Sequence, residues 1–115
     1  MYRFLLLLIL TTPIFARAQT NLSVTVSGLI KDTKKTPLPY ANVLLKQAKD
    51  SAFVTGTVSG NDGRFTLANV KSGNYILEIS MLGFVTKKQA VTVGTLSAFL
   101  DLGNFELAED ARMLN

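Results

Sequence analysis

The stretch "GNDGRFTLANVKSGNYILEISMLGF", Gly60–Phe84, decides how the chain can fold. It contains two glycine turns, each followed by a run in which apolar and polar residues alternate, as in a strand with one buried face. The triplet Asn61-Asp62-Gly63 is the strongest hairpin signal in the chain, because these residue types tolerate the positive φ angles of tight turns. The stretch therefore predicts two strands between tight turns. The second strand has an inward face of Tyr75, Leu77, Ile79 and Met81.

Five further segments show the same strand pattern, with turn signals about every 8 to 12 residues. They are Val24–Asp32, Tyr40–Lys46, Ala52–Ser59, Lys87–Val93 and Phe99–Leu107. The last segment changes parity across Gly103 and Asn104, which predicts a β-bulge. Together with the strands of the first stretch, Arg64–Val70 and Asn74–Phe84, these segments predict an all-β fold, a seven-stranded antiparallel β-sandwich.

The N-terminus has the pattern of a secretory signal peptide. A basic start precedes the apolar run Phe4–Leu10, and the small residues Ala16 and Ala18 predict cleavage before Gln19. The alternative is a transmembrane anchor, but the apolar stretch extends over only about 12 residues, whereas spanning a bilayer takes about 20. We expect residues 1–18 to be the signal peptide, residues 19–107 to be the β-sandwich domain and residues 108–115 to be an exit segment, in an exported protein.

The composition and charge of the chain argue against a nucleic acid as its partner. The chain is 48% hydrophobic and 17% charged, which is typical of a globular domain. Loss of the signal peptide leaves ten basic and eight acidic residues, a nearly balanced mature chain. The pairs Lys34–Lys35 and Lys87–Lys88 are isolated, so we expect no nucleic-acid binding. They are interpreted as solvated loop and edge-strand lysines, which discourage edge-to-edge aggregation.

The search for catalytic residues yields none. The chain has no histidine and no cysteine, so a Ser-His-Asp triad, a thiol nucleophile and the usual zinc ligands are excluded. A glycosidase would need two carboxylates facing one cleft, which spacing alone does not show. The sequence predicts no enzyme, no cofactor and no metal site. The carboxylates are Asp32, Asp50, Asp62, Glu78, Asp101, Glu106, Glu109 and Asp110.

The aromatic residues allow two interpretations, a sugar-stacking platform or a core. Most of them fall on the inward parity of their strands, which favours the core. Tyr40 falls on the outer parity and is the best candidate for an exposed contact, although a cross-strand packing partner is the favoured interpretation. The aromatics concerned are Phe65, Tyr75, Phe84, Phe99 and Phe105.

The order of these motifs resembles the carboxypeptidase regulatory-like domain. The family pattern runs G-x-(V/I)-x-D, P-L-P-x-A-x-V, T-D-x-x-G-x-F, G-x-Y and G-(Y/F), and the resemblance covers about Val24 to Leu107. It implies a Greek-key sandwich of the transthyretin or immunoglobulin type. Ser59-Gly60 stand where the family has Thr-Asp, which is interpreted as a change among turn formers. The matching residues are Gly28, Ile30, Asp32, Pro37, Leu38, Pro39, Ala41, Val43, Gly63, Phe65, Gly73, Tyr75, Gly83 and Phe84.

The C-terminal residues resemble the version of this domain found at the N-terminus of Bacteroidetes outer-membrane β-barrel proteins, including TonB-dependent receptors. The resemblance implies a truncated or partial chain whose partner is a C-terminal barrel or plug region, or other receptor components. The domain itself is not expected to insert into the membrane. The residues that match are Leu102, Gly103, Leu107, Asp110, Ala111 and Leu114, with Phe105 in place of an isoleucine.

Two functions remain open. The first is a non-catalytic periplasmic module of an outer-membrane receptor or transporter, with its contacts made by the loop residues Lys34, Lys35 and Thr36 and by Gly60–Gly63. The second is a free-standing secreted carbohydrate-binding or adhesion module, an analogy that rests on fold alone. A third, an accessory domain of a metallopeptidase, is less favoured because of the C-terminal resemblance.

Overall fold

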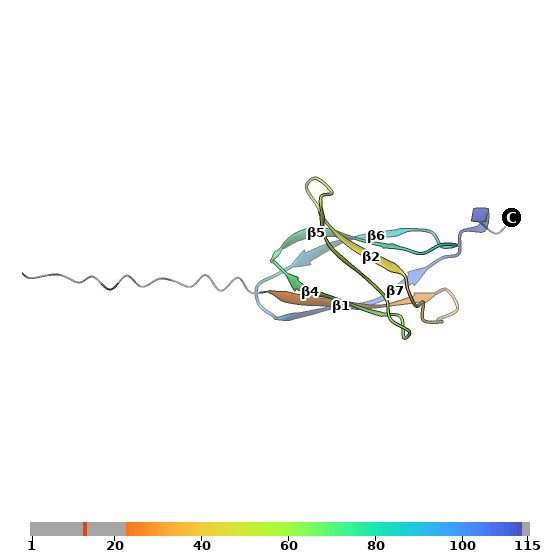
Figure 1. Cartoon of the computed structure of the whole chain (residues 1–115), viewed down its shortest axis with the longest axis horizontal. Helices are drawn as coiled ribbons and strands as arrows, with labels where there is room; N and C mark the ends of the chain where they lie inside the picture. The colour runs from red at the N-terminus through yellow and green to blue at the C-terminus, as the bar shows by residue number, and fades with distance from the viewer. Residues whose placement is uncertain (1–12, 14–22, 114–115) are drawn as a thin grey trace, which may run out of the picture.

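The computed structural model describes Pro13 and residues 23–113. The predicted signal-peptide positions Ala16 and Ala18 and the predicted mature N-terminus Gln19 lie outside the described residues. The described chain folds into seven strands and one short 3-10 helix (Figure 1). These elements are β1 (Val24–Asp32), β2 (Asn42–Gln47), β3 (Phe53–Val58), β4 (Arg64–Val70), β5 (Gly73–Ser80), β6 (Lys87–Val93), β7 (Phe99–Leu107) and η1 (Ala111–Met113).

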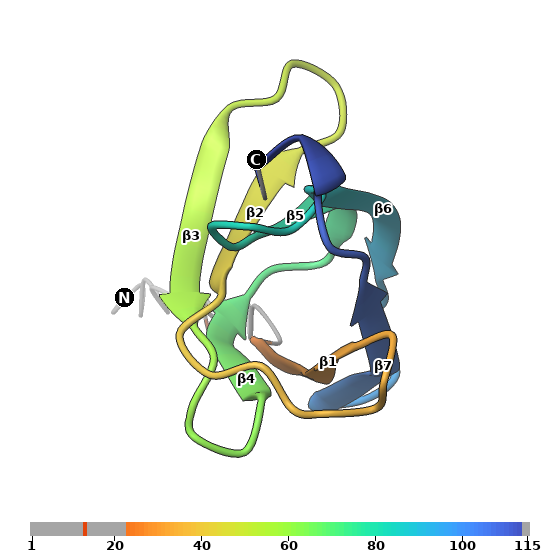
Figure 2. The same cartoon turned by 90° about the vertical axis from the view of Figure 1, so that its right-hand side faces the viewer.

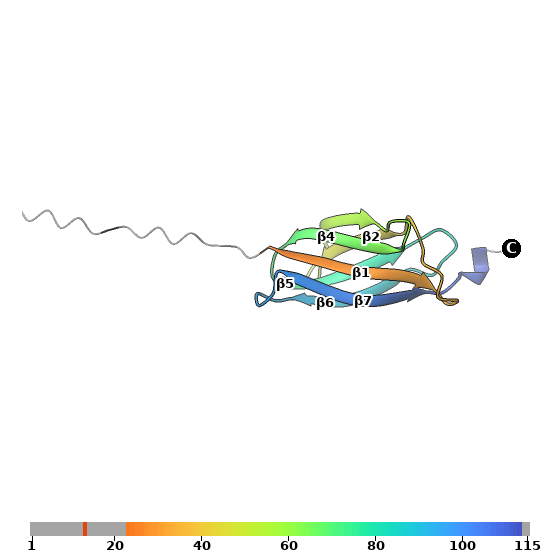
Figure 3. The ribbon, with the colours of Figure 1, turned by 90° about the horizontal axis from the view of Figure 1, so that it is seen from below.

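The strands form two sheets that pack face to face. One sheet has the order β4-β1-β7 and the other the order β3-β2-β5-β6, so β3 and β6 are the edges of the larger sheet. Figure 3 shows the smaller sheet in front of the larger one. The pairs β2–β3 and β5–β6 are hairpins, and each of the other four connections crosses between the sheets. The seven-stranded sandwich predicted from the sequence is confirmed.

Strand pairing differs from the sequence-based prediction in two places. β1 pairs with β7 in parallel, from Thr25 opposite Phe99 to Asp32 opposite Leu107, so the sandwich is not antiparallel throughout. The predicted hairpin at Asn61–Gly63 is wrong, because β3 and β4 belong to different sheets. The triplet does form a tight turn, but this turn carries the chain from one sheet to the other.

The core lies between the sheets and follows the predicted alternation. In β1 every second residue from Val24 to Ile30 is buried. The bulge predicted in β7 is confirmed by a shift in its register with β1, and Gly103 has a φ of 79° there. The buried apolar residues are Val24, Val26, Ile30, Leu38, Ala41, Val43, Leu45, Phe65, Leu67, Val70, Tyr75, Leu77, Ile79, Val91, Val93, Phe105 and Leu107.

Candidate functional site

The parallel pairing of β1 and β7 places the segments that follow them at the same end of the sandwich. We call this the loop end; it consists of residues 33–41, 60–63, 81–86 and 108–113. Figure 2 is viewed from this side and shows these segments facing the viewer. The two loops predicted as a contact surface, Lys34–Thr36 and Gly60–Gly63, both belong to it, and the chain leaves β7 beside them.

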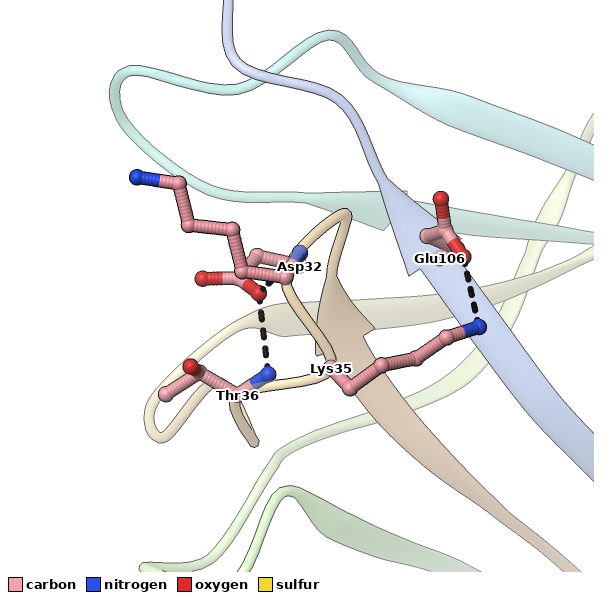
Figure 4. A network of polar contacts seen from close by, with 5 residues as sticks. Asp32, Lys35, Thr36 and Glu106 are labelled. Carbon is pink, nitrogen blue, oxygen red and sulfur yellow. Dashed lines mark hydrogen bonds and ion pairs between the residues drawn. The ribbon is translucent and has the colours of Figure 1, made fainter.

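The loop after β1 is built around the side chain of Asp32. Its Oδ1 accepts hydrogen bonds from the backbone N–H groups of Lys34 (2.8 Å) and Thr36 (2.9 Å). The Lys35 ammonium lies 3.4 Å from the Glu106 carboxylate on β7, and both side chains are exposed (Figure 4). Asp32 thus stabilises one conformation of the turn that contains the two lysines. Its carboxylate accepts hydrogen bonds from the two backbone N–H groups of this turn, which have no neighbouring strand to bond to.

The turn at Gly60–Gly63 is fixed against the C-terminal part of β1. The carbonyl oxygen of Gly63 accepts a hydrogen bond of 2.8 Å from the N–H of Ile30, at the end of β1. Gly63 has a φ of 79°, and a Cβ placed on it would lie 2.5 Å from the carbonyl oxygen of Ile30. Since both the conformation and the contact exclude a side chain, only glycine fits here.

Tyr40 links the two loops. Its hydroxyl donates a hydrogen bond of 3.1 Å to Oδ1 of Asn61, and its side chain is 69% exposed. The residue precedes β2 and has a φ of 61°, so it does not pack across strands. The interpretation of Tyr40 as a cross-strand packing partner is therefore wrong, and its interpretation as an exposed residue is correct.

Ser59 is a buried residue whose role sequence patterning missed. Its hydroxyl donates a hydrogen bond of 2.6 Å to the carbonyl oxygen of Leu38 and accepts one of 2.9 Å from the N–H of Ala41. Only 1% of Ser59 is exposed. The interpretation of this position as a turn former has to be revised, because the hydroxyl ties the end of β3 to the loop before β2. The sequence offered only one indication, a serine followed by a glycine, and that dipeptide is equally common in turns.

The remaining residues of the family pattern shape the core and its turns. A Cβ on Gly28 would lie 2.6 Å from the ring of Phe65, so this glycine makes room for the aromatic pair Phe65–Phe105. Val43 and Ala41 are fully buried, and Pro39 lies in the loop between them and β1. The Tyr75 hydroxyl donates a hydrogen bond of 2.6 Å to the carbonyl oxygen of Lys71, which closes the turn that contains Gly73.

The exit segment is attached to the loop between β5 and β6. The N–H of Val85 bonds to the carbonyl oxygen of Ala108 (2.8 Å), and the N–H of Asp110 bonds to that of Gly83 (2.9 Å). Gly83 has a φ of 88°, and Phe84 forms a β-bridge with Glu109. Hydrogen bonds from Arg112 lower the pKa of the Asp110 carboxyl. The chain is therefore guided across the loop end as it leaves the domain.

Apart from Glu109, the carboxylates serve their own turns or ion pairs rather than one cleft. Asp50, Asp62 and Asp101 each accept a backbone hydrogen bond from two residues further along. Glu78 pairs with Lys46 at 2.8 Å. In the described part of the chain, no three His, Cys, Asp or Glu side chains gather closely enough to hold a metal ion. Over the same residues, no helix has the length and apolarity needed to cross a membrane.

The predicted aromatic residues do not form one platform. Phe65, Tyr75 and Phe105 are buried, and Phe84 packs partly against the core. Phe99 is 75% exposed, but it lies at the start of β7, at the end of the sandwich opposite the loop end. The interpretation as core residues is therefore confirmed for the three buried aromatics. The two exposed ones, Phe99 and Tyr40, lie at opposite ends of the sandwich and do not form one surface.

The fold is shared with solved structures of diverse function. The pilus 2b backbone protein of group B streptococcus matches with a TM-score of 0.61 and 19% identity, over 81% of this chain and 43% of that one. The 5-hydroxyisourate hydrolase of Klebsiella pneumoniae matches with a TM-score of 0.59 and 22% identity, over 76% and 92%. This chain spans less than half the length of the pilin structures that it matches. At such identities the likeness shows the fold alone.

The sequence comparison is more specific. No curated protein sequence matches the chain. The sequence pattern of the carboxypeptidase regulatory-like domain matches residues 25–108. This range begins in β1 and ends just after β7, so it includes both sheets and the loops between the strands. The chain therefore belongs to the carboxypeptidase regulatory-like domain family.

Proposed function

We propose that this domain is a non-catalytic, periplasmic docking and spacing module at the N-terminus of an outer-membrane β-barrel protein of the TonB-dependent receptor type. The observation that carries the proposal is the loop end, where two turns, exposed except at Gly63, are fixed by hydrogen bonds beside the segment that follows β7. The turns are Lys34–Thr36 and Gly60–Gly63.

A docking role is supported by the polar side chains, which stabilise turns. Asp32, Asp62 and Asp101 stabilise turns by accepting backbone hydrogen bonds, and Glu106 pairs with Lys35. The sequence contains no histidine or cysteine that could act as a general base or thiol nucleophile. Side chains that fix loop conformation reduce the entropy lost when those loops bind a partner.

The route of the C-terminal segment supports a partner on the C-terminal side. Ala108 and Asp110 are bonded to the loop between β5 and β6, so a region joined after this segment would start at the loop end. Lys34 and Lys35 place two exposed positive charges in one turn of this end, and Lys35 pairs with Glu106. An acidic side chain on a plug or barrel surface would match this turn, because opposite charges favour encounter and orientation.

The test is a pair of charge reversals in the native host. Lys34→Glu with Lys35→Glu, combined with Asn61→Ala, changes the loop end only. The matched control is Lys49→Glu with Lys71→Glu, two turn lysines at the opposite end of the sandwich. We expect the loop-end variant to reduce receptor-dependent uptake and the control variant to leave it unchanged. Equal uptake by both variants, at equal protein levels, would reject the proposed contact surface.

The outer-membrane context has its own test. The coding frame downstream of codon 115 is read, and the native protein is located by immunoblot of periplasmic and outer-membrane fractions. We expect a continuing frame with alternating segments of about 10 residues and aromatic girdles, and a product in the outer membrane. A stop codon with no continuation, together with a purely periplasmic product, would contradict the receptor context and leave the docking surface to be explained by a separate partner.

A further inference from the structure

The edge strand β3 lacks the features that protect the other sheet edges. β6 carries Lys87 and Lys88, and β7 carries acidic residues and the bulge at Gly103. β4 carries Arg64 next to the turn. β3 reads FVTGTV and contains no charged residue and no proline. Figure 2 shows β3 running along one side of the sandwich. Uncharged edges of this kind are templates for pairing with another strand.

The backbone groups available for pairing follow from the β2–β3 ladder. The N–H of Ser59 bonds to the carbonyl oxygen of Ala41, and Thr57 lies opposite Val43 two residues further along. In an antiparallel ladder alternate residues face the partner strand. The backbone N–H and C=O groups of Thr57 and Ser59 point toward β2. Those of Gly56 and Val58 therefore point in the opposite direction, within the plane of the sheet, at its open edge.

The outer surface next to this edge is apolar. Val58 is 53% exposed and Phe53 is 65% exposed. Gly56 lies between them, and a Cβ on it would lie 3.0 Å from the carbonyl oxygen of Val43 and 3.1 Å from Cδ2 of Leu44. Because these contacts leave no room for a side chain, Leu44 and the ring of Phe53 cover this glycine and present an apolar surface beside the edge.

We propose that β3 pairs with β3 of a second copy of this chain, antiparallel and about a two-fold axis at Thr57. In this register Gly56 of one copy lies opposite Val58 of the other. The outward N–H and C=O groups of these two residues then form reciprocal hydrogen bonds. Each Val58 side chain packs over the partner's Gly56, against Leu44 and Phe53. A continuous eight-stranded sheet results from the two four-stranded sheets.

Charge favours a second copy over a charged peptide as the occupant. A two-fold interface contains the same strand twice, so every charge on an edge strand would be present twice in it. Self-pairing through β6 would bring Lys87 and Lys88 of both copies into one interface. β3 brings no charge into such an interface, and its exposed Val58 would meet the apolar surface at Gly56 of the other copy.

The first test measures the oligomeric state of the full chain, in the form that the cell exports, by sedimentation over a concentration series. We expect a concentration-dependent dimer. Val58→Lys should raise the dimer dissociation constant by roughly tenfold or more, because a buried charge at the centre of an interface is costly. The matched control is Val85→Lys, which makes the same change at an apolar residue of similar exposure, 47% against 53%.

The second test uses the absence of native cysteine. Thr57→Cys places a thiol on the axis, where directly opposed Cα atoms are about 4.5 Å apart, within disulfide reach. We expect Thr57→Cys to form a disulfide-linked dimer under mild oxidation. Thr55→Cys, an equally half-buried position on the same strand, should not form one. Circular dichroism of each variant confirms that it is folded.

The outcomes decide the proposal. The proposal is supported if the natural chain and Val85→Lys form dimers and Val58→Lys dimerises more weakly. Cross-linking should occur through Thr57→Cys and not through Thr55→Cys. A monomer at every concentration overturns it. Equal dimerisation by both lysine variants, or equal loss in both, also overturns it, because the contact then lies elsewhere. Cross-linking through Thr55→Cys with none through Thr57→Cys would overturn the stated register.

Discussion

The hydroxyl of Ser59 donates a hydrogen bond of 2.6 Å to the carbonyl oxygen of Leu38, and this contact joins the end of β3 to the loop before β2. The same hydroxyl accepts from the N–H of Ala41, so one side chain satisfies two backbone groups of a buried segment. The loop end therefore depends on a residue whose place in the family pattern suggested only a turn former.

Replacement of Ser59 by alanine should lower the free energy of unfolding by about 1–3 kcal/mol, because the buried N–H of Ala41 loses its partner. Chemical denaturation measures the change. Ser59→Thr keeps the hydroxyl and serves as the control, with a smaller loss. A Ser59→Ala variant as stable as the natural protein would show that the two bonds contribute nothing net.

Three glycine-to-alanine variants separate backbone strain from steric contact. Gly94 has no atom within 4 Å of a built Cβ, and its φ is not in the positive range. Gly83 is equally open but has a φ of 88°. Gly63 has both a φ of 79° and a contact of 2.5 Å with backbone. We expect losses of about 0, about 1 and more than about 2 kcal/mol in that order, by thermal or chemical unfolding. Any other order of the three stability losses would contradict the separate contributions assigned to backbone strain and to steric contact.

Tyr75→Phe removes the hydrogen bond of 2.6 Å from the phenol to the carbonyl oxygen of Lys71 but keeps the buried ring. We expect a loss of about 0.5–1.5 kcal/mol in the free energy of unfolding, since the ring continues to fill the core. The control is Tyr40→Phe, whose hydroxyl bond to Asn61 is exposed, and this change should cost less. Equal losses would mean that burial of the bond is unimportant.

The ion pair between Glu78 and Lys46 predicts a pH dependence. The hydrogen bond from Lys46 is the largest cause that lowers the pKa of Glu78 below its usual value. Burial opposes it, and the charges of Lys46 and Lys88 lower the pKa by smaller amounts. A lowered pKa in the folded state means that the contribution to stability is present above the unfolded-state pKa. It is lost as the pH falls through the folded-state pKa.

Melting curves between about pH 7 and about pH 3, for the natural protein and Glu78→Gln, test this expectation. At neutral pH the natural protein should be more stable by about 0.5–1 kcal/mol, and the difference should shrink as the carboxyl protonates. A difference that stays constant over this range would show that the charge of Glu78 is not its source.

Sequence patterning predicted the faces of the strands well. The bounds of β1, β4, β6 and β7 coincide with the predicted ranges, and the bulge at Gly103 was visible as a change of parity. These features are local, since side chains alternate along a strand with a period of two wherever that strand lies. The two loops of the candidate site were also predicted from their turn residues.

The sequence by itself determined which residues face inward and where the chain turns, because alternation and turn chemistry act between near neighbours. Only the tertiary structure decided which strands pair. It placed β1 parallel to β7, made the turn at Asn61–Gly63 a crossing between sheets and left β3 at an open edge. It also gave Ser59 its two partners, 18 and 21 residues distant in sequence. Such contacts depend on how whole sheets stack, and a period of two is compatible with many pairings of the same strands.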